Sequence, residues 1–352
     1  MRAVVVTPGQ GGSARLTDVP DPRPTEGDAL VRLVRAGACG TDTEIDRGDF
    51  GQAPDGDDYL VIGHENLGRV ERGVGPIVAG DLVVATVRRP DQCPNCQVGE
   101  VDMCLAGGYT ERGIKARHGF WAEAYAESPS FLIKLPPELE PIGVLLEPMS
   151  VVEKAVRQSY ALQRRMRWEP RQTVVLGAGP IGLLATVLLR LRGLDVVTVA
   201  RSKGTRASEL AEAAGARYLS ARDVPIPQLG GELGRIDLIV EATGNGQVAF
   251  EALQALGTNG VLCLTSVTGG HRPIEVDVDR LNLRLVLDNL TVFGSVNANR
   301  VDFEQGVADL ARARDRWPGL LDRVITRRLP LAEFRAALDG SPGDIKTVLE
   351  IG

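Results

Sequence analysis

Cys39, His64 and Glu147 carry side chains that bind metal ions, and the first two stand in short polar motifs. Cys39 opens the run CGTD, and His64 lies in the run GHEN, where Glu65 follows it. Thiolate, imidazole and carboxylate groups are all good zinc ligands. A zinc ion held with one open position can polarise a substrate hydroxyl as a Lewis acid. Taken singly, each residue also fits a plain alternative: a buried thiol, a satisfied histidine or a surface carboxylate.

A glycine fingerprint follows a predicted strand and opens a predicted helix. It consists of Gly177, Gly179, Pro180, Ile181 and Gly182, with Ala at position 178. In such a motif the first Gly permits a tight turn, the second lets the backbone approach a pyrophosphate, and the third lets helix and strand pack closely. The helix N-terminus attracts the phosphates. The fingerprint predicts dinucleotide binding, and its alternative is a Gly-rich turn in a domain that binds no cofactor.

The end of the next predicted strand indicates which dinucleotide is bound. An Asp or Glu there would bind the ribose of NAD, but the sequence reads VARSK and contains no acid. Arg201, Ser202, Lys203 and the nearby Arg206 instead suit a 2′-phosphate through charge-assisted hydrogen bonds. Thr243, after a later strand, is a further candidate for cofactor binding. The sequence therefore predicts NADP, or NAD, as the cofactor, and a solvated basic loop is the alternative.

The elements that must position these residues change in kind along the chain. Up to about residue 155, short β-rich runs alternate with Gly, Pro and Asp. From about 170 to 300, apolar strands alternate with helices, which predicts βαβ units and a parallel sheet. After 300, a helix, a strand and another helix follow. The predicted strands cover 1–6, 29–37, 68–74, 81–87, 173–179, 195–200, 237–243, 260–268 and 290–296, and the clearest helices cover 180–193, 205–216 and 300–317.

Composition excludes several classes of protein. The 352 residues are 43% apolar and 24% charged, with a net charge of −6. We expect no nucleic-acid partner, because no basic patch or tail is present. No run approaches the roughly 18 apolar residues of a membrane span, and the N-terminus lacks a signal-peptide pattern, so we expect a cytoplasmic protein without membrane contact. Three of the five cysteines are clustered, which fits metal ligation better than disulfides.

The order and spacing of these motifs resemble those of zinc-dependent medium-chain dehydrogenases, over essentially the whole chain. Three further stretches resemble the glucose dehydrogenase branch: LEPMSVVEK at 146–154, the segment from Glu111 to Phe120, and GSVNAN at 294–299. The resemblance implies an α/β protein with a GroES-like, β-rich catalytic domain (1–155 and 300–352) and a Rossmann nucleotide-binding domain (156–299). We also expect a homo-oligomer, either a dimer or a tetramer.

The resemblance assigns roles to the residues of the first motifs. Cys39 and His64 bind the catalytic zinc directly, and Glu65 and Glu147 are the carboxylate ligands. Glu65 has the alternative role of orienting the site without touching the metal. Thr41 is similar in position to the residue whose hydroxyl starts a proton relay to solvent. Its alternative is a turn residue that bonds its own backbone.

The branch implies oxidation of the C1 hydroxyl of an aldose to the lactone, with hydride transfer to the nicotinamide. A sugar needs several polar groups to orient it, and the matching segments offer Glu111, His118, Glu147 and Asn297 beside Thr41. Asn297 has the alternative of contacting only the cofactor, and Glu111 that of a surface residue. Two other functions stay open: a polyol or secondary-alcohol dehydrogenase, and a zinc-free cofactor-binding protein, against which the presence of Cys39 and His64 argues.

A second metal site is predicted in the cysteine cluster. Family members hold a structural zinc with four cysteines in the pattern C-x2-C-x2-C-x2-G-x4-C. Cys93, Cys96 and Cys104 match the last three, but Pro90 stands where the first should be. Because structural zinc takes four ligands, Asp91 is the candidate for the fourth. The alternative is three reduced cysteines in a lobe held by packing.

Overall fold

The computed structural model describes residues 1–269, 271 and 273–352, whose internal contacts form two units. Unit 1 comprises Met1–Ser150, Asn297–Leu310 and Ile325–Gly352, and unit 2 comprises Val151–Val296 and Ala311–Val324. The sequence places all of 300–352 with the N-terminal domain. The structure groups Ala311–Val324 with unit 2, because α10 (Leu320–Val324) packs against α5 (Arg206–Ala213) and Arg323 forms an ion pair with Glu209.

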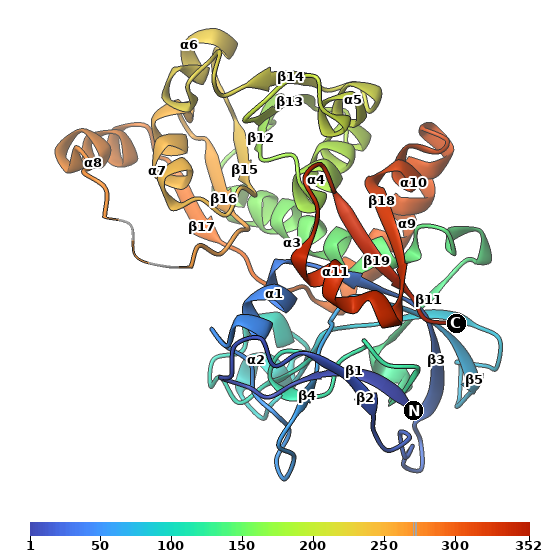
Figure 1. Cartoon of the computed structure of the whole chain (residues 1–352). Coiled ribbons are helices and arrows are strands. Elements are labelled where there is room, and N and C mark those ends of the chain that lie inside the picture. The colour runs from blue at the N-terminus through green and yellow to red at the C-terminus, as the bar shows by residue number, and fades with distance from the viewer. Residues whose placement is uncertain (270, 272) are drawn as a thin grey trace. The chain divides into compact units, whose positions relative to one another are not determined.

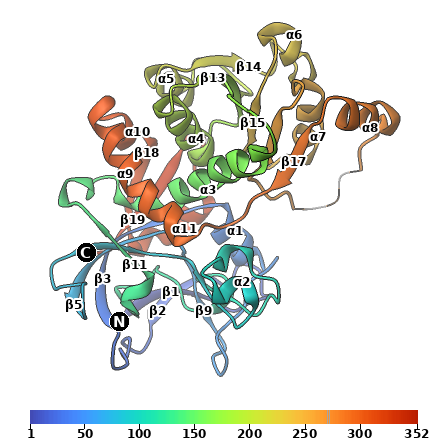
Figure 2. The ribbon, with the colours of Figure 1, turned by 180° about the vertical axis from the view of Figure 1, so that it is seen from behind.

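Unit 1 is built on a largely antiparallel sheet in which β19, the last strand of the chain, pairs with β3 (Figure 2). The strand order is β11–β6–β5–β3–β19–β18, and β10 also pairs with β3. The bounds are β3 (Ala29–Ala38), β5 (Asn66–Arg72), β6 (Leu82–Ala85), β10 (Ala124–Glu127), β11 (Leu132–Leu135), β18 (Ile325–Pro330) and β19 (Lys346–Glu350). Alternate residues of β3, such as Val31 and Leu33, pack against Phe120 and Tyr125 in the core, as the two-residue period of a half-buried strand requires.

Two smaller sheets complete the β structure described in unit 1. One has the order β2–β1–β4, from β1 (Arg2–Val6), β2 (Arg15–Asp18) and β4 (Leu60–Val61). The other has the order β7–β8–β9, from β7 (Arg88–Arg89), β8 (Thr110–Arg112) and β9 (Ala116–Arg117). The helices that begin in this unit are α1 (Gly40–Arg47), α2 (Pro94–Gln97), α3 (Leu146–Leu162), α9 (Arg300–Arg316) and α11 (Phe334–Asp339). The unit boundaries at 150 and 310 fall inside α3 and α9.

Unit 2 holds a parallel sheet in the order β14–β13–β12–β15–β16–β17 (Figure 1). The strands are β12 (Gln172–Leu176), β13 (Asp195–Ala200), β14 (Arg217–Ser220), β15 (Leu238–Glu241), β16 (Val261–Leu264) and β17 (Thr291–Gly294). Its other helices are α4 (Pro180–Leu191), α6 (Leu229–Leu233), α7 (Gly246–Ala255) and α8 (Val278–Leu287). The strand order reverses between β12 and β15, and open α/β sheets bind dinucleotides at such a switch point.

The strands of unit 2 read as nearly continuous apolar runs because the sheet is buried on both faces. Val174, Val197, Ile239 and Leu262 come from four neighbouring strands and share one buried cluster with residues of α7. No helix in the described part of the chain has both the length and the apolar character needed to cross a membrane.

Candidate metal centre and cofactor site

Cys39 and His64 converge because a strand end and a loop meet beside a short helix. Cys39 follows β3 and is the N-cap of α1, and His64 lies in the loop between β4 and β5. The Sγ atom of Cys39 is 3.3 Å from Nε2 of His64. This separation suits two ligands of one zinc ion. The other ring nitrogen, Nδ1, faces Asp42, whose Oδ1 atom lies 3.6 Å away.

Asp42 fixes both of these residues and was not assigned a role from the sequence. It is completely buried at the third position of α1, and its Oδ2 atom accepts a 2.9 Å hydrogen bond from the backbone N–H of Cys39. Burial alone would lower the pKa of His64, but the charges of Cys39 and Asp42 raise that pKa well above 6.5. A carboxylate behind a ligating histidine orients the ring and raises its basicity, so Asp42 suits a metal site.

Glu65 is held by a lysine from the far end of the sequence. The Nζ atom of Lys346, on β19, donates to Oε1 of Glu65 at 2.5 Å and to the carbonyl oxygen of Ala38 at 2.9 Å. Both side chains of the ion pair are nearly fully buried. Oε2 of Glu65 is buried and has no hydrogen-bond partner in the described chain. A Cβ atom at Gly37 would lie 1.9 Å from this oxygen, so only glycine leaves room for the carboxylate.

The donor set of this group fits a zinc ion. Ligand atoms of Cys39, His64 and Glu65 all lie within 4.8 Å of one another. The buried Oε2 of Glu65 lacks a partner, and an unpaired buried carboxylate oxygen is costly, which a bound cation would correct. Thiolate, imidazole and carboxylate together are the ligands expected of a catalytic zinc, with a fourth position left open.

Glu147 lies near this group but outside the set of atoms within 4.8 Å. It is buried in the first turn of α3. Burial raises its pKa to about 7, His64 and Lys346 oppose that rise, and Glu65 adds to it. The predicted ligand therefore sits close enough to interact electrostatically with the predicted zinc site.

The hydroxyl of Thr41 makes no hydrogen bond that the described structure records. Thr41 is half-buried in the first turn of α1, two residues after Cys39. The alternative in which it bonds its own backbone is therefore not seen. A hydroxyl without an internal partner beside the predicted metal site is free to exchange a proton with a ligand or water.

Glu111 and Asn297 meet although they are far apart in the sequence. Nδ2 of Asn297 donates a 2.8 Å hydrogen bond to Oε1 of Glu111. Glu111 is buried, so the alternative of a surface residue is wrong. His118 has both ring nitrogens engaged, because Nδ1 accepts from the N–H of Val61 at 3.2 Å and Nε2 lies 3.0 Å from Oδ2 of Asp57. A sugar contact through His118 would have to replace one of these bonds.

The predicted second metal site is assembled as a group of four residues. Ligand atoms of Asp91, Cys93, Cys96 and Cys104 lie within 4.8 Å of one another. The thiol of Cys104 donates to Oδ2 of Asp91 at 3.0 Å, and this bond and the N–H of Cys93 hold the pKa of Asp91 well below its usual range. Four converging ligands meet the number that structural zinc takes, so Asp91 fits the vacant fourth place.

The structure gives each glycine of the fingerprint the backbone geometry that the sequence motif predicts. Gly177 has φ of +106°, and a Cβ there would lie 2.6 Å from the carbonyl oxygen of Ala242. A Cβ at Gly182 would lie 2.1 Å from the carbonyl oxygen of Gly177. Gly179 caps α4 and has nothing within 4 Å of its Cβ position, so a phosphate can approach its backbone. Pro180 and Ile181 form the first turn of α4.

The basic cluster after β13 exposes two guanidinium groups. The side chains of Arg201 and Arg206 are exposed and have no ion pair in the described structure, whereas Lys203 pairs with Asp223 at 2.9 Å. Ser202 lies between Arg201 and Lys203 in the sequence, and its carbonyl oxygen accepts a hydrogen bond from the hydroxyl of Tyr218. Free cationic groups at this strand end suit a 2′-phosphate.

Thr243 is engaged in a local network at the end of β15. Its N–H and its hydroxyl both donate to Oε1 of Glu241, at 2.6 and 2.5 Å, and the hydroxyl of Ser266 donates to Oε2 at 2.5 Å. The loop that Thr243 opens is thereby fixed at the switch point of the sheet. A cofactor would meet the backbone of this loop rather than a free Thr243 hydroxyl.

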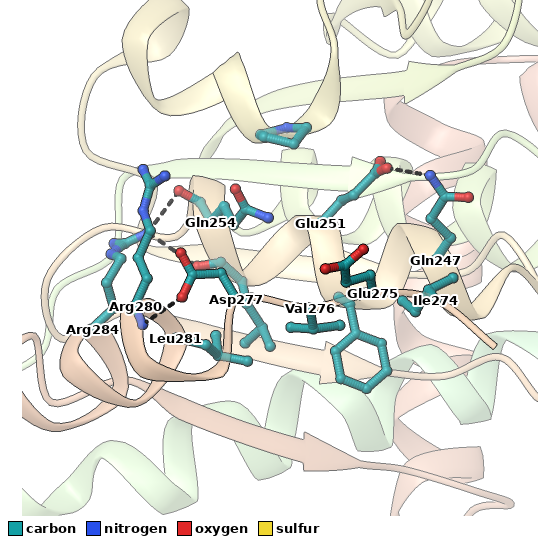
Figure 3. A pocket seen from close by; sticks show the side chains of 13 residues that line it. Gln247, Glu251, Gln254, Ile274, Glu275, Val276, Asp277, Arg280, Leu281 and Arg284 are labelled. Carbon is teal, nitrogen blue, oxygen red and sulfur yellow. Dashed lines mark hydrogen bonds between the residues drawn. The ribbon is translucent and has the colours of Figure 1, made fainter.

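A separate pocket of about 430 Å³ lies between α7 and α8 in unit 2 (Figure 3). Glu251, Glu275, Asp277, Arg280 and Arg284 give it a mixed charge. None of the residues predicted to bind zinc, cofactor or sugar lines it. The pocket therefore contributes nothing to the predicted chemistry.

Comparisons with known proteins decide the family. The model for the glucose dehydrogenase C-terminus matches residues 140–351, and that for the alcohol dehydrogenase GroES-like domain matches residues 25–137. The chain belongs to the glucose dehydrogenase family. The predicted zinc-dependent medium-chain family, its glucose dehydrogenase branch and the GroES-like plus Rossmann fold class are thus confirmed.

Individual glucose dehydrogenases match over their full length. The chain is 48% identical to glucose 1-dehydrogenase of Methanocella arvoryzae, with 100% of both chains covered. It is 42% identical to that of Thermoproteus tenax, with 100% of this chain and 99% of the other covered. The structure of Haloferax mediterranei glucose dehydrogenase in complex with NADP, zinc and gluconolactone superposes with a TM-score of 0.92, at 33% identity, covering 100% of this chain and 99% of that one.

Proposed function

We propose that this member of the glucose dehydrogenase family oxidises the C1 hydroxyl of glucose to the lactone, with zinc and NADP. The observation that carries the proposal is the convergence of Cys39, His64 and Glu65 within 4.8 Å, in a chain 48% identical to a glucose 1-dehydrogenase. The Haloferax mediterranei enzyme, with its bound NADP, zinc and gluconolactone, supports the same reaction.

Cys39 and His64 would hold the catalytic zinc together with the carboxylates Glu65 and Glu147, which would exchange with water or substrate so that one position is open. When bound, zinc supplies a Lewis acid for the C1 hydroxyl, and NADP accepts the hydride. Asp42 keeps the His64 ring oriented from behind. The buried Lys346 keeps Oε1 of Glu65 occupied, so that this carboxylate offers the other oxygen to the metal.

The proton of the C1 hydroxyl leaves through Thr41, whose hydroxyl has no partner among the described residues. Glu111 and Asn297 orient the sugar, because a hydrogen bond joins their side chains and places their polar atoms side by side in unit 1. A site that hydrogen-bonds several hydroxyls rejects alcohols that lack them, since its buried polar groups would be left unpaired.

In this proposal a structural zinc is held by Asp91, Cys93, Cys96 and Cys104. NADP is bound by the residues from Gly177 to Gly182 together with Arg201 and Arg206. The predicted cytoplasmic location stays a prediction.

We also keep the predicted homo-oligomer, in which unit 2 of one subunit contacts unit 2 of another. β17 is the edge strand of its sheet, and α8 exposes Val278, Leu283, Val286 and Leu287. Light scattering of the wild type and of Val286→Asp tests this: a monomeric wild type contradicts it.

The sugar site is tested by Glu111→Gln and Asn297→Ala. Both variants are expected to lower kcat/KM for glucose and to leave the dissociation constant of NADP nearly unchanged. The loss should be larger for glucose than for a deoxy sugar that lacks the contacted hydroxyl, because that analogue never made the bond. Equal weakening of NADP and glucose would show that these residues are scaffold.

A further inference from the structure

Three N–H groups converge on a single oxygen of Glu111. Nε and Nη2 of Arg88 lie 3.0 and 2.9 Å from Oε1, and Nδ2 of Asn297 lies 2.8 Å from the same atom. An arginine side chain commonly binds a carboxylate through two parallel hydrogen bonds, one to each oxygen. Here it leaves Oε2 of Glu111 with no hydrogen-bond partner among the described residues, and this oxygen is not one of the fully buried unpaired atoms. It therefore reaches solvent.

The sequence brings these residues together through strand register. Arg88 on β7 lies directly opposite Glu111 on β8 in an antiparallel pair, so the two side chains stand on the same face of the small sheet. Asn297 adopts φ of +59°, which non-glycine residues rarely do, and its Oδ1 accepts from the N–H of Ala298 at 2.7 Å. A left-handed backbone and an internal bond fix the direction of its amide.

Arg88 is itself locked in place. Its guanidinium lies 3.8 Å from the ring centroid of Tyr109, and Nζ of Lys115 lies 4.2 Å from the same ring. Nη1 donates to the carbonyl oxygen of Asp102 at 3.2 Å. The residue is only 5% exposed. A buried arginine with a stacked ring and a backbone acceptor has little freedom to release the carboxylate that it holds.

We propose that Arg88 is a positioning residue for sugar recognition: it occupies Oε1 of Glu111 and so leaves Oε2 as one fixed acceptor for a sugar hydroxyl. The inference rests on the proposed function and adds a determinant of its substrate specificity. Arg88 acts through Glu111 and, because Asn297 donates to the same Oε1, through the position of Asn297 as well. Neutralising Arg88 leaves a buried carboxylate with one amide partner, free to turn.

Arg88→Met, Arg88→Lys and the control Arg89→Met test this. Arg89 is the chain neighbour of Arg88 and equally buried, but it pairs with Glu127 instead. Steady-state kinetics with glucose and its 2-deoxy and 3-deoxy analogues would be combined with NADP binding by fluorescence and zinc content by mass spectrometry. Arg88→Met is expected to raise KM for glucose by about 10- to 100-fold, the range for a lost charged hydrogen bond, with kcat, NADP affinity and zinc content nearly unchanged.

The discrimination between glucose and the deoxy sugar that lacks the contacted hydroxyl should shrink in Arg88→Met and be partly recovered in Arg88→Lys. The double variant with Glu111→Gln should lose little more than either single one, because both remove the same contact. Equal kinetic losses in Arg88→Met and Arg89→Met, with discrimination intact, would overturn the inference while glucose oxidation by the wild type stands. A wild type inactive on glucose would overturn the proposed function and this inference together.

Discussion

Lys346 and Glu65 form a buried ion pair across 281 positions of the sequence, at the edge of the predicted zinc site. The lysine comes from β19, the last strand, and the glutamate follows His64 directly. Burial alone would lower the pKa of Lys346, but Glu65 and Cys39 raise it, so the side chain stays charged. β19, which lies between β3 and β18 in the sheet of unit 1, thus also sets the charge beside the predicted metal ligands.

Replacing Lys346 with Met should destabilise the zinc-free protein by about 3–5 kcal/mol, because it leaves Glu65 as an uncompensated buried charge. The double variant Lys346→Met/Glu65→Gln should recover much of that loss. Urea unfolding of chelator-treated protein measures both. A single variant as stable as the wild type would show that the pair is not needed for the charge balance of the site.

Gly37→Ala should weaken zinc binding by about 10- to 100-fold, as the loss of an orienting contact at a metal site does. The new Cβ would lie 1.9 Å from Oε2 of Glu65, so the carboxylate must move. Gly40→Ala is the matched control, because nothing lies within 4 Å of its Cβ position. Competition with a chromogenic chelator gives both affinities, and equal values for the two variants would remove Glu65 from the ligand set.

Zinc uptake should depend on pH through Glu147. Its pKa is raised to about 7 by burial, so the zinc-free site holds a proton below pH 7 that the metal must displace. Zinc affinity should rise as pH increases to about 7, and Glu147→Gln should release one proton fewer. His64, whose pKa is also raised, keeps some pH dependence in the variant. Calorimetry in two buffers of different ionisation enthalpy counts the protons, and identical counts would contradict the ligand role of Glu147.

Cofactor preference should follow the exposed guanidinium groups after β13. Ala200→Asp would place a carboxylate at the strand end, where it repels a 2′-phosphate and can bind a ribose hydroxyl. We expect a shift toward NAD of about 1–3 kcal/mol in relative kcat/KM, the range for charged hydrogen bonds. Equal use of both cofactors by the wild type, unaltered in Arg201→Ala, would exclude a phosphate site at this cluster.

The sequence predicted the parts of the molecule that local pattern controls. The parallel strands of unit 2 appear as apolar runs, and the glycines at 177 and 182 lie where a Cβ would collide with backbone. Cys39 and His64 each stand in a recognisable short motif, so their role as metal ligands could be predicted from the sequence. Asp91 could be found as the fourth member of its cluster by counting ligands.

Contacts between distant residues could not be predicted in this way. Lys346 carries no signal in the sequence that points to Glu65. Arg88 and Glu111 meet through a two-residue strand, which is too short to show a period. His118 was a candidate sugar contact from its segment, but its ring nitrogens are engaged by the N–H of Val61 and the carboxylate of Asp57.

The most direct test of the central claim is kcat/KM with NADP for glucose and for ethanol, measured before and after removal of zinc. Glucose should exceed ethanol by orders of magnitude, because unpaired polar groups penalise the smaller alcohol. Chelation should abolish glucose oxidation, and zinc should restore it. Full activity in a metal-free preparation, or comparable values for the two alcohols, would contradict a zinc-dependent glucose dehydrogenase.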